Sequence, residues 1–229
     1  ESISYYTNNL EIDSVNPSSD KDIFDKVKDL NKYEGLIWGG SSLNIYSDTK
    51  EIRKQIEFMK ECQKRIKNIL AICWGMQVAV TAAGGVVNRG KNGAHRGIAH
   101  GIVINQDGLN HPIYKDKDKI FNTPAFNYDE VVTLPKNAIL LSSNKINNVM
   151  ALNFETEFSK IWGIQYHPEI TYEKMITLIK FRRKRLLENK SFSDEKDLES
   201  HITMIENEDK ITKKESRMRE LKNWLDLIA

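Results

Sequence analysis

The sequence predicts an α/β protein built as a three-layer, open and mostly parallel sheet, followed by a C-terminal helical extension. Over residues 10–83, short apolar runs alternate with amphipathic stretches in the order strand, helix, strand, helix, strand, helix. Residues 86–165 change to short strands separated by polar turns, which predict an antiparallel extension of the sheet. The remaining chain has helical periodicity and is strongly charged, so we divide the chain into a domain at 1–170 and an extension at 171–229.

The first half of the chain supports each element of this alternation in turn. Alternating apolar residues predict strands, and apolar residues at helical spacing predict helices. Pro17 ends the first strand, and Gly84 and Gly85 end the last helix of this half. The expected elements are a strand at 10–16, a helix at 20–31, a strand at 34–38, a helix at 48–67, a strand at 68–72 and a helix at 74–83.

The second half is expected to contribute strands at 101–105, 123–128, 138–142, 148–154 and 160–166. No apolar strand precedes residues 10–16, and the chain does not begin with Met. We therefore expect that a first strand is missing from this sequence.

Composition argues against several classes of function. A formal net charge of +2 gives no electrostatic reason to expect nucleic acid or membrane binding, and no apolar run approaches the roughly 20 residues of a spanning helix. Two cysteines make no disulfide framework, which favours a cytoplasmic protein. The basic run at 180–185 lies in an amphipathic helix and is interpreted as a solvated face. No metal or cofactor is predicted, because the spacing of four histidines fits neither zinc binding nor catalysis: His95, His100, His111 and His201.

Cys73 is the predicted nucleophile. An apolar strand at 68–72 runs directly into Cys73 and a helix follows, which is the pattern of a nucleophile elbow. The small residues Ala71 and Gly75 permit the sharp turn, and the helix N-terminus favours a thiolate. Cys62 lies in the middle of an apolar helical stripe and is interpreted as a buried structural residue.

His167 and Glu169 are the predicted base and its orienting carboxylate. They are separated by Pro168 at the end of a strand, and in extended backbone such residues project to the same side. A carboxylate beside an imidazole selects its tautomer and stabilises the imidazolium that forms when a thiol is deprotonated.

A glycine turn after the strand at 34–38 supplies the third part of the predicted site. In a parallel sheet such loops gather at the carboxyl edge, where ligands bind. The backbone N–H groups of Gly40 and Trp74 are therefore predicted to form an oxyanion hole.

Together, Gly39-Gly40, the run from Cys73 to Gln77 and the run from Tyr166 to Glu169 resemble the class I, triad-type glutamine amidotransferases. The resemblance is to stand-alone members similar to the glutaminase domain of GMP synthase. It implies the flavodoxin-like fold of that family for residues 1–170.

The resemblance also implies the roles of several site residues. Gln77 would help to hold the substrate, and the loop at 126–129 would contact the α-amino end of the substrate. Many members have Ser-His-x-Asp where this chain has Phe126-Asn127-Tyr128-Asp129, so Asp129 alone carries over from that motif. Gly39 and Asn127 complete the predicted substrate-binding set.

The resemblance implies hydrolysis of the glutamine side-chain amide through a γ-glutamyl thioester, with ammonia passing to an acceptor. The chain contains no GxxxxGK[ST] phosphate-binding loop, so a synthetase partner would carry the acceptor site. Two alternatives stay open: a γ-glutamyl peptidase or hydrolase with the same triad, and a non-catalytic regulatory protein on this scaffold. The last helix carries an apolar stripe that predicts docking onto the domain, with a homodimer interface as the alternative.

Overall fold

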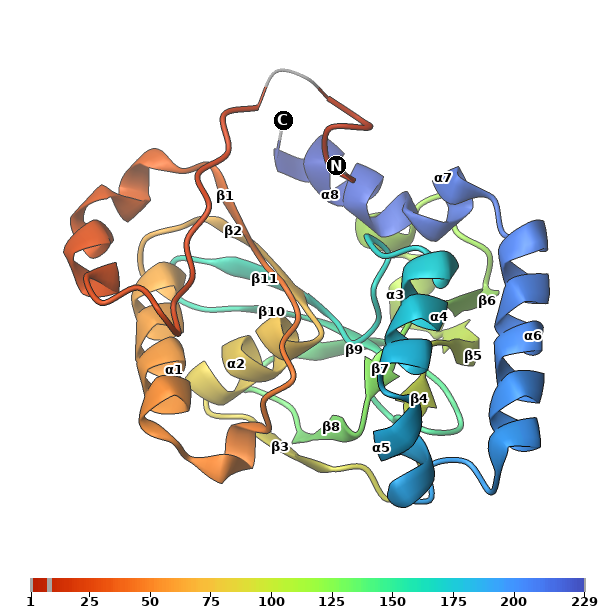
Figure 1. Ribbon diagram of the computed structural model, residues 1–229. Coiled ribbons are helices and arrows are strands. Elements are labelled where there is room, and N and C mark those ends of the chain that lie inside the picture. Colours follow the sequence, from red (N-terminus) through yellow and green to blue (C-terminus); the bar gives the residue numbers. More distant parts are fainter. Residues whose placement is uncertain (1, 8–9, 229) are drawn as a thin grey trace.

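A computed structural model describes residues 2–7 and 10–228, and its centre is a seven-stranded sheet between helices (Figure 1). The strand order is β1-β2-β11-β10-β9-β5-β6. The pairs β1–β2 and β2–β11 are parallel, and the other neighbouring pairs are antiparallel. The strands of this sheet are β1 (Gly35–Trp38), β2 (Asn68–Ile72), β5 (Ala99–Ile104), β6 (Ile120–Thr123), β9 (Ile139–Ser143), β10 (Ala151–Glu155) and β11 (Lys160–Ile164).

Two small antiparallel ribbons flank the carboxyl edge of the parallel strands. They pair β3 (Val86–Arg89) with β8 (Asp129–Thr133), and β4 (His95–Arg96) with β7 (Phe126–Asn127). The second ribbon brings the start of the predicted substrate loop at 126–129 into a paired strand, which limits its freedom.

The helices fall into two groups along the chain. Those that precede or interrupt the sheet are η1 (Ile23–Lys32), η2 (Ile45–Ser47), α1 (Lys50–Gln63), α2 (Trp74–Ala82), α3 (Gln106–Leu109) and η3 (Pro112–Tyr114). Those of the extension are α4 (Tyr172–Phe181), α5 (Arg183–Glu188), α6 (Glu195–Ile211), α7 (Lys214–Arg217) and α8 (Arg219–Ile228). The η elements are 3-10 helices. No helix in the described part of the chain is long and apolar enough to cross a membrane.

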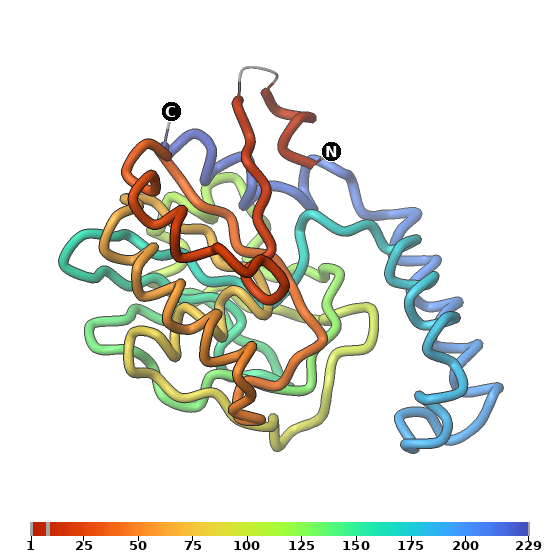
Figure 2. The backbone as a smooth tube through the Cα atoms, turned by 60° about the vertical axis from the view of Figure 1, so that its left-hand side comes forward, coloured from red at the N-terminus to blue at the C-terminus, as the bar shows by residue number. Residues whose placement is uncertain are grey.

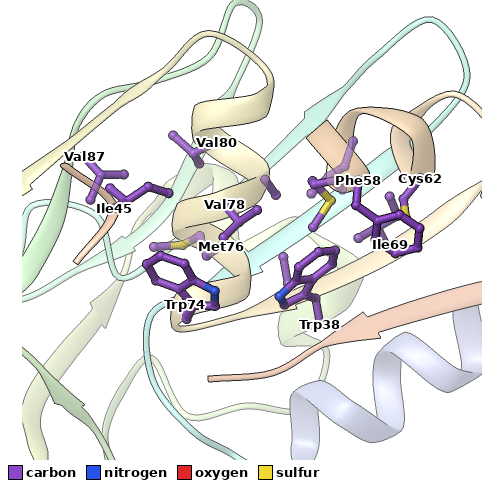
Figure 3. Packing of buried hydrophobic residues seen from close by; sticks show 14 of the residues in the cluster. Trp38, Ile45, Phe58, Cys62, Ile69, Trp74, Met76, Val78, Val80 and Val87 are labelled. Carbon is purple, nitrogen blue, oxygen red and sulfur yellow. The ribbon is translucent and has the colours of Figure 1, made fainter. Parts of the chain in front are cut away.

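Alternate residues of β2 divide the core into two layers. Ile69 and Ala71 pack with α1 and α2 on one face of the sheet, whereas Leu70 and Ile72 pack on the other face with α8. Figure 3 shows part of the first layer, where Trp38, Phe58 and Trp74 gather between α1, α2 and the sheet. This burial on both faces explains why β2 is a continuous apolar run.

The helical extension contributes to the second layer and also builds a third cluster. The side chains of Met218, Leu221 and Trp224 are buried in the second layer, so α8 docks onto the domain as its apolar stripe predicted. Helices α4 and α6 pack side by side, with Ile179 and Ile205 buried between them, and lie along one side of the molecule (Figure 2).

The three-layer α/β class with a helical extension is confirmed, but four predicted elements were wrong in detail. The strand predicted at 123–128 is divided between the end of β6 and β7. Residues 10–16 do not form a strand. The apolar side chains of this segment, Leu10, Ile12 and Val15, are exposed and so do not contribute to the core. The helix predicted at 20–31 is the 3-10 helix η1. Strand β11 was expected in the antiparallel extension, yet it lies beside β2 and parallel to it, because its apolar residues fit a central position buried on both faces.

Candidate active site

Cys73 lies between β2 and α2 with a backbone conformation that few residues other than glycine adopt. Its φ is 54° and its ψ is −105°. The Cys73 N–H donates to the carbonyl of Ile164 on the neighbouring strand, at 2.7 Å, which holds the turn in place. Backbone strain of this kind gathers at functional sites and is the geometry of a nucleophile elbow. The predicted turn is therefore present, and it presents the thiol at the carboxyl edge of β2.

Two glycines let the neighbouring segments come close to this turn. A Cβ atom on Gly75 would lie 2.1 Å from the carbonyl oxygen of Trp38, and the Gly75 N–H donates to Gly39 O at 3.2 Å. A Cβ atom on Gly40 would lie 2.8 Å from Cε1 of His167. The glycine turn after β1 is thus packed directly against both the elbow and the imidazole.

His167 and Glu169 form the pair that their spacing predicted. His167 Nδ1 lies 2.7 Å from Glu169 Oε1, and the His167 N–H donates to the carbonyl of Pro124 at 2.8 Å. The imidazole is buried, so its orientation is fixed by these contacts. With Nδ1 engaged by the carboxylate, Nε2 is left to act on a proton at Cys73.

The charge state of this site follows from its neighbours. Burial by itself lowers the pKa of His167, but the charge of Cys73, a hydrogen bond to it and the Glu169 carboxylate outweigh burial and raise this pKa to about 10. The imidazolium is therefore the stable form of His167 at neutral pH.

The backbone donors of the predicted oxyanion hole are available. Within the described chain, the N–H groups of Gly40 and Trp74 donate to no protein acceptor. The Trp74 ring is anchored by its Nε1, which donates to Gln55 Oε1 at 2.8 Å. Both N–H groups belong to segments in contact with the elbow, as an oxyanion hole requires.

A row of two buried glutamines leads to the sulfur. Gln77 Nε2 lies 3.4 Å from Gln165 Oε1, and Gln165 Nε2 lies 3.5 Å from Cys73 Sγ. Gln165 was not predicted as a site residue, although its place two residues before His167 on the same strand end was a usable indication.

A pocket of about 150 Å³ opens beside Cys73. Its walls come from the segment after β1, the start of α2, the loop at 126–129 and the helical extension. They are formed by Ser41, Ser42, Leu43, Asn44, Cys73, Trp74, Gln77, Arg89, Phe126, Asn127, Tyr128, Asp129, Arg182, Arg185, Leu186 and Asn189.

The structure brings Gln77, Asn127 and Asp129 of the predicted substrate-binding set to this pocket, but not Gly39. Asp129 accepts a hydrogen bond from Tyr46 Oη at 3.0 Å, and burial raises the pKa of Asp129. The Asn127 side chain is engaged by protein groups, since Oδ1 lies 2.8 Å from His95 Nδ1 and Nδ2 donates to Asp129 O. Asn127 thus shapes the loop, and His95 is its internal partner.

The basic run at 180–185 was interpreted as a solvated face; Arg185 is exposed and Arg182 is half-buried, and both also line the pocket, which was not predicted. Periodicity could not reveal this, because the turn between α4 and α5 decides which side chains point inward. Arg183 conforms to the expectation, with ion pairs to Glu195 and Glu199. In the described chain, no group of three or more His, Cys, Asp or Glu side chains could hold a metal ion.

The structure thus belongs to the class of α/β proteins that carry a cysteine on a strand-to-helix elbow beside an imidazole–carboxylate pair. The chain belongs to the glutamine amidotransferase class-I family, whose profile matches residues 3–183. The family predicted from the sequence motifs is thereby confirmed.

Known proteins place the chain within this family. It is 30% identical over 166 residues to γ-glutamyl-L-1-hydroxyisopropylamide hydrolase of a Pseudomonas species, covering 71% of this chain and 56% of that protein. It is 28% identical over 174 residues to the glutamine-hydrolysing GMP synthase of Thermotoga maritima, covering 74% of this chain and 32% of that protein. The chain thus spans just over half of the first relative and about a third of the second.

A solved structure shows the same fold. The crystal structure of a glutamine amidotransferase from Thermotoga maritima superposes with a TM-score of 0.65 at 20% identity, covering 87% of this chain and 79% of that one.

Proposed function

We propose that this protein hydrolyses the γ-amide bond of a γ-glutamyl compound through a thioester on Cys73, with the side-chain amide of glutamine as the simplest substrate. The observation that carries the proposal is the thiol–imidazole–carboxylate arrangement on a strained elbow, beside a pocket lined by Cys73 and Asp129. Membership of the glutamine amidotransferase class-I family supports the choice of substrate class.

The first half of the proposed reaction forms the thioester. The Cys73 thiolate attacks the γ-carbonyl carbon, and the carbonyl π electrons move to oxygen. The backbone N–H groups of Gly40 and Trp74 stabilise this oxyanion, and each such donor contributes roughly 2.7–4 kcal/mol to transition-state stabilisation. His167, as the imidazolium, donates its Nε2 proton to the departing nitrogen, so that ammonia or an amine leaves as the C–N bond breaks.

The second half regenerates the enzyme. Neutral His167 accepts a proton from water as the water oxygen attacks the thioester carbon. The C–S bond then breaks, glutamate leaves, and the thiolate–imidazolium pair is restored. Glu169 stabilises the imidazolium at both stages and keeps its tautomer fixed, so it acts on the reaction through His167.

We further propose that the ammonia passes to an acceptor on a synthetase partner when glutamine is the substrate. The GMP synthase relative supports this, since it is described as glutamine-hydrolysing and the chain matches only a third of it. The hydrolase relative favours the second candidate, hydrolysis of a larger γ-glutamyl amide without a partner. Both candidates use the same chemistry at Cys73. A cytoplasmic location and a homodimer remain proposals.

The test compares Cys73→Ala with Cys62→Ala, because Cys62 is a second buried thiol that does not line the pocket. Release of glutamate from glutamine and from γ-glutamylmethylamide is measured for both variants and the wild type. We expect Cys73→Ala to lower turnover by a factor on the order of 10⁴ or more, and Cys62→Ala to retain it. A glutamine-like electrophile should add one adduct to the wild type and none to Cys73→Ala, measured by intact mass. Equal turnover by the wild type and Cys73→Ala would contradict the proposal.

A further inference from the structure

We propose that Arg182 and Arg185 form a carboxylate-binding subsite in the wall of the Cys73 pocket, so that the helical extension selects the substrate. The inference builds on the proposed function, since it concerns the γ-glutamyl compound that the same pocket would hold. Two sources of the carboxylate share this chemistry: the α-carboxylate of the γ-glutamyl group, and a carboxylate in the amine that leaves.

The two arginines are directed to the pocket by the break between α4 and α5. Arg182 lies at this junction and Arg185 lies one helical turn further on, so both guanidinium groups face the same side. Arg183 points elsewhere, where it pairs with Glu195 and Glu199 on α6. One short segment therefore carries two pocket-lining arginines and one that has a structural partner.

Arg182 is held in position by an aromatic ring of the substrate loop. Its guanidinium carbon lies 5.0 Å from the centroid of Phe126. Tyr128 of the same loop contacts a second arginine in this way, since the Arg89 guanidinium carbon lies 4.6 Å from the centroid of the Tyr128 ring. Stacking orients a guanidinium without using its N–H donors, so these groups remain able to bind a planar anion.

The charges around the pocket are not balanced by the protein. The lining carries three guanidinium groups, and its one carboxylate is Asp129. Burial raises the pKa of Asp129, and the positive charge of Arg89 acts in the opposite direction. Arg89 is thus the arginine that interacts with the Asp129 carboxylate. Arg182 and Arg185 have no carboxylate within ion-pair distance among the described residues. Two positive charges are thus left for the ligand.

A carboxylate is the anion that the proposed chemistry brings to this place. Every γ-glutamyl amide carries one on its α-carbon, and a γ-glutamyl amino acid carries a second one in its amine part. A guanidinium group can bind a carboxylate through two parallel N–H···O hydrogen bonds. Its fixed, planar arrangement of donors therefore makes arginine suited to recognising a carboxylate. Asp129 and the Arg pair together offer complementary charges to an amino-acid end that has both an ammonium and a carboxylate group.

The experiment compares R182Q/R185Q with R183Q and with the wild type on four substrates. Glutamine and glutamine α-amide differ in the α-carboxylate alone. The amides γ-glutamylglycine and γ-glutamylmethylamide differ in the carboxylate of the amine part. R183Q removes one positive charge from the same short segment outside the pocket lining, so it controls for charge removal and for effects on helix packing there.

We expect the double variant to lose about 10- to 100-fold in kcat/KM, mainly through KM, on the substrate that carries the recognised carboxylate. A loss on glutamine that is absent with glutamine α-amide assigns the subsite to the α-carboxylate. A loss on γ-glutamylglycine that is absent with γ-glutamylmethylamide assigns it to the amine part. Equal loss on all four substrates, or no loss on any, overturns the subsite.

A binding measurement keeps the inference testable without turnover. Titration calorimetry of Cys73→Ala with γ-glutamylglycine, which carries both carboxylates, should give a dissociation constant that rises about tenfold or more when R182Q/R185Q is added, and stays unchanged when R183Q is added. Unchanged binding by the triple variant would overturn the inference. Absence of Cys73-dependent turnover by the wild type, with arginine-dependent γ-glutamylglycine binding intact, would instead contradict the proposed function alone.

Discussion

Cys62 and Cys73 are both buried thiols, yet their surroundings give them opposite chemistry. Cys62 lies inside α1 against apolar neighbours, and burial raises the pKa of its thiol to about 12. Cys73 instead lies beside the His167 imidazolium and directly before the N-terminus of α2. Burial alone therefore does not decide whether a cysteine is inert, and the neighbouring charge does.

Alkylation by iodoacetamide should separate these two residues over the range from pH 6 to pH 9. The pKa of His167 is raised from 6.5 to about 10, so the imidazolium persists through this range and is lost only above it. We expect the alkylation rate of Cys73 to vary by less than about threefold, because the imidazolium that the proposed mechanism pairs with Cys73 is present throughout this range. Cys62 should stay unlabelled in the folded protein.

His167→Gln supplies the matched comparison for this measurement. Without the imidazolium, labelling of Cys73 should rise roughly tenfold per pH unit below pH 8, as it does for an ordinary thiol. Peptide mapping of the labelled protein identifies the site. A wild-type rate that climbs as steeply as that of His167→Gln would show that no thiolate–imidazolium pair exists at neutral pH.

At the scale of elements, the local sequence pattern predicted the strands and the helix that bring Cys73 and His167 to the edge of the sheet. It did not predict which strands lie next to each other in the sheet. Strands β1 and β2 and helix α2 lie where apolar periodicity and glycine turns predicted them. Pairing is set by long-range packing, so the apolar run of β11 could not reveal that β2 would be its parallel neighbour. The alternation at 10–16 shows the same limit, because a strand needs a partner that local sequence does not specify.

The same limit applies to the site. His167 and Glu169 could be found from their spacing, since extended backbone places them on one side. Gln165, Arg182 and Arg185 could not, because their approach to Cys73 or its pocket depends on contacts between segments far apart in the chain. Arg217 is a further case: this buried residue of α7 donates to the carbonyls of Pro168 and Ile170, on either side of Glu169.

We expect Arg217 to act as a positioning residue for the turn that carries Glu169. In Arg217→Gln the two carbonyls lose their shared donor, so the Glu169 carboxylate should shift relative to His167. Turnover of glutamine should fall about 10- to 100-fold through kcat with little change in KM, since small displacements of catalytic groups carry penalties of this size.

Lys214→Gln is the matched control for Arg217→Gln, because Lys214 lies on the same short helix with its ammonium over the Tyr5 ring. It should leave kcat unchanged. A purely structural role for Arg217 would lower the melting temperature while leaving the pH profile of kcat/KM in place, whereas a positioning role should shift the limb assigned to His167. An unshifted profile with full kcat would contradict the expectation.

On the scale of the whole molecule, the extension and the sheet share one core and one buried ionic network. Trp224 of α8 packs so closely on β1 that a Cβ on Gly35 would lie 2.8 Å from its ring. Glu220 of α8 accepts from Tyr166 Oη at 2.6 Å and from Lys117 Nζ at 3.0 Å, and all three groups are buried. The predicted boundary between 170 and 171 thus crosses dense packing, and Tyr166, the residue directly before His167, is bonded to α8.

Removal of the Glu220 carboxylate should therefore destabilise the molecule as a unit. In Glu220→Ala the Lys117 ammonium and the Tyr166 hydroxyl lose an acceptor that water does not readily replace. We expect the free energy of unfolding to fall by about 3–5 kcal/mol, the usual effect of removing one partner of a buried ion pair. Asp226→Ala removes an exposed carboxylate that pairs with Lys222 on the same helix, and should cost about 0–1 kcal/mol. Urea unfolding of both variants, followed by tryptophan fluorescence and by circular dichroism, measures the two losses. Because α8 and the sheet share a core, the two signals should change at one midpoint, and a separate earlier transition in either signal would show that residues 171–229 unfold independently of the domain.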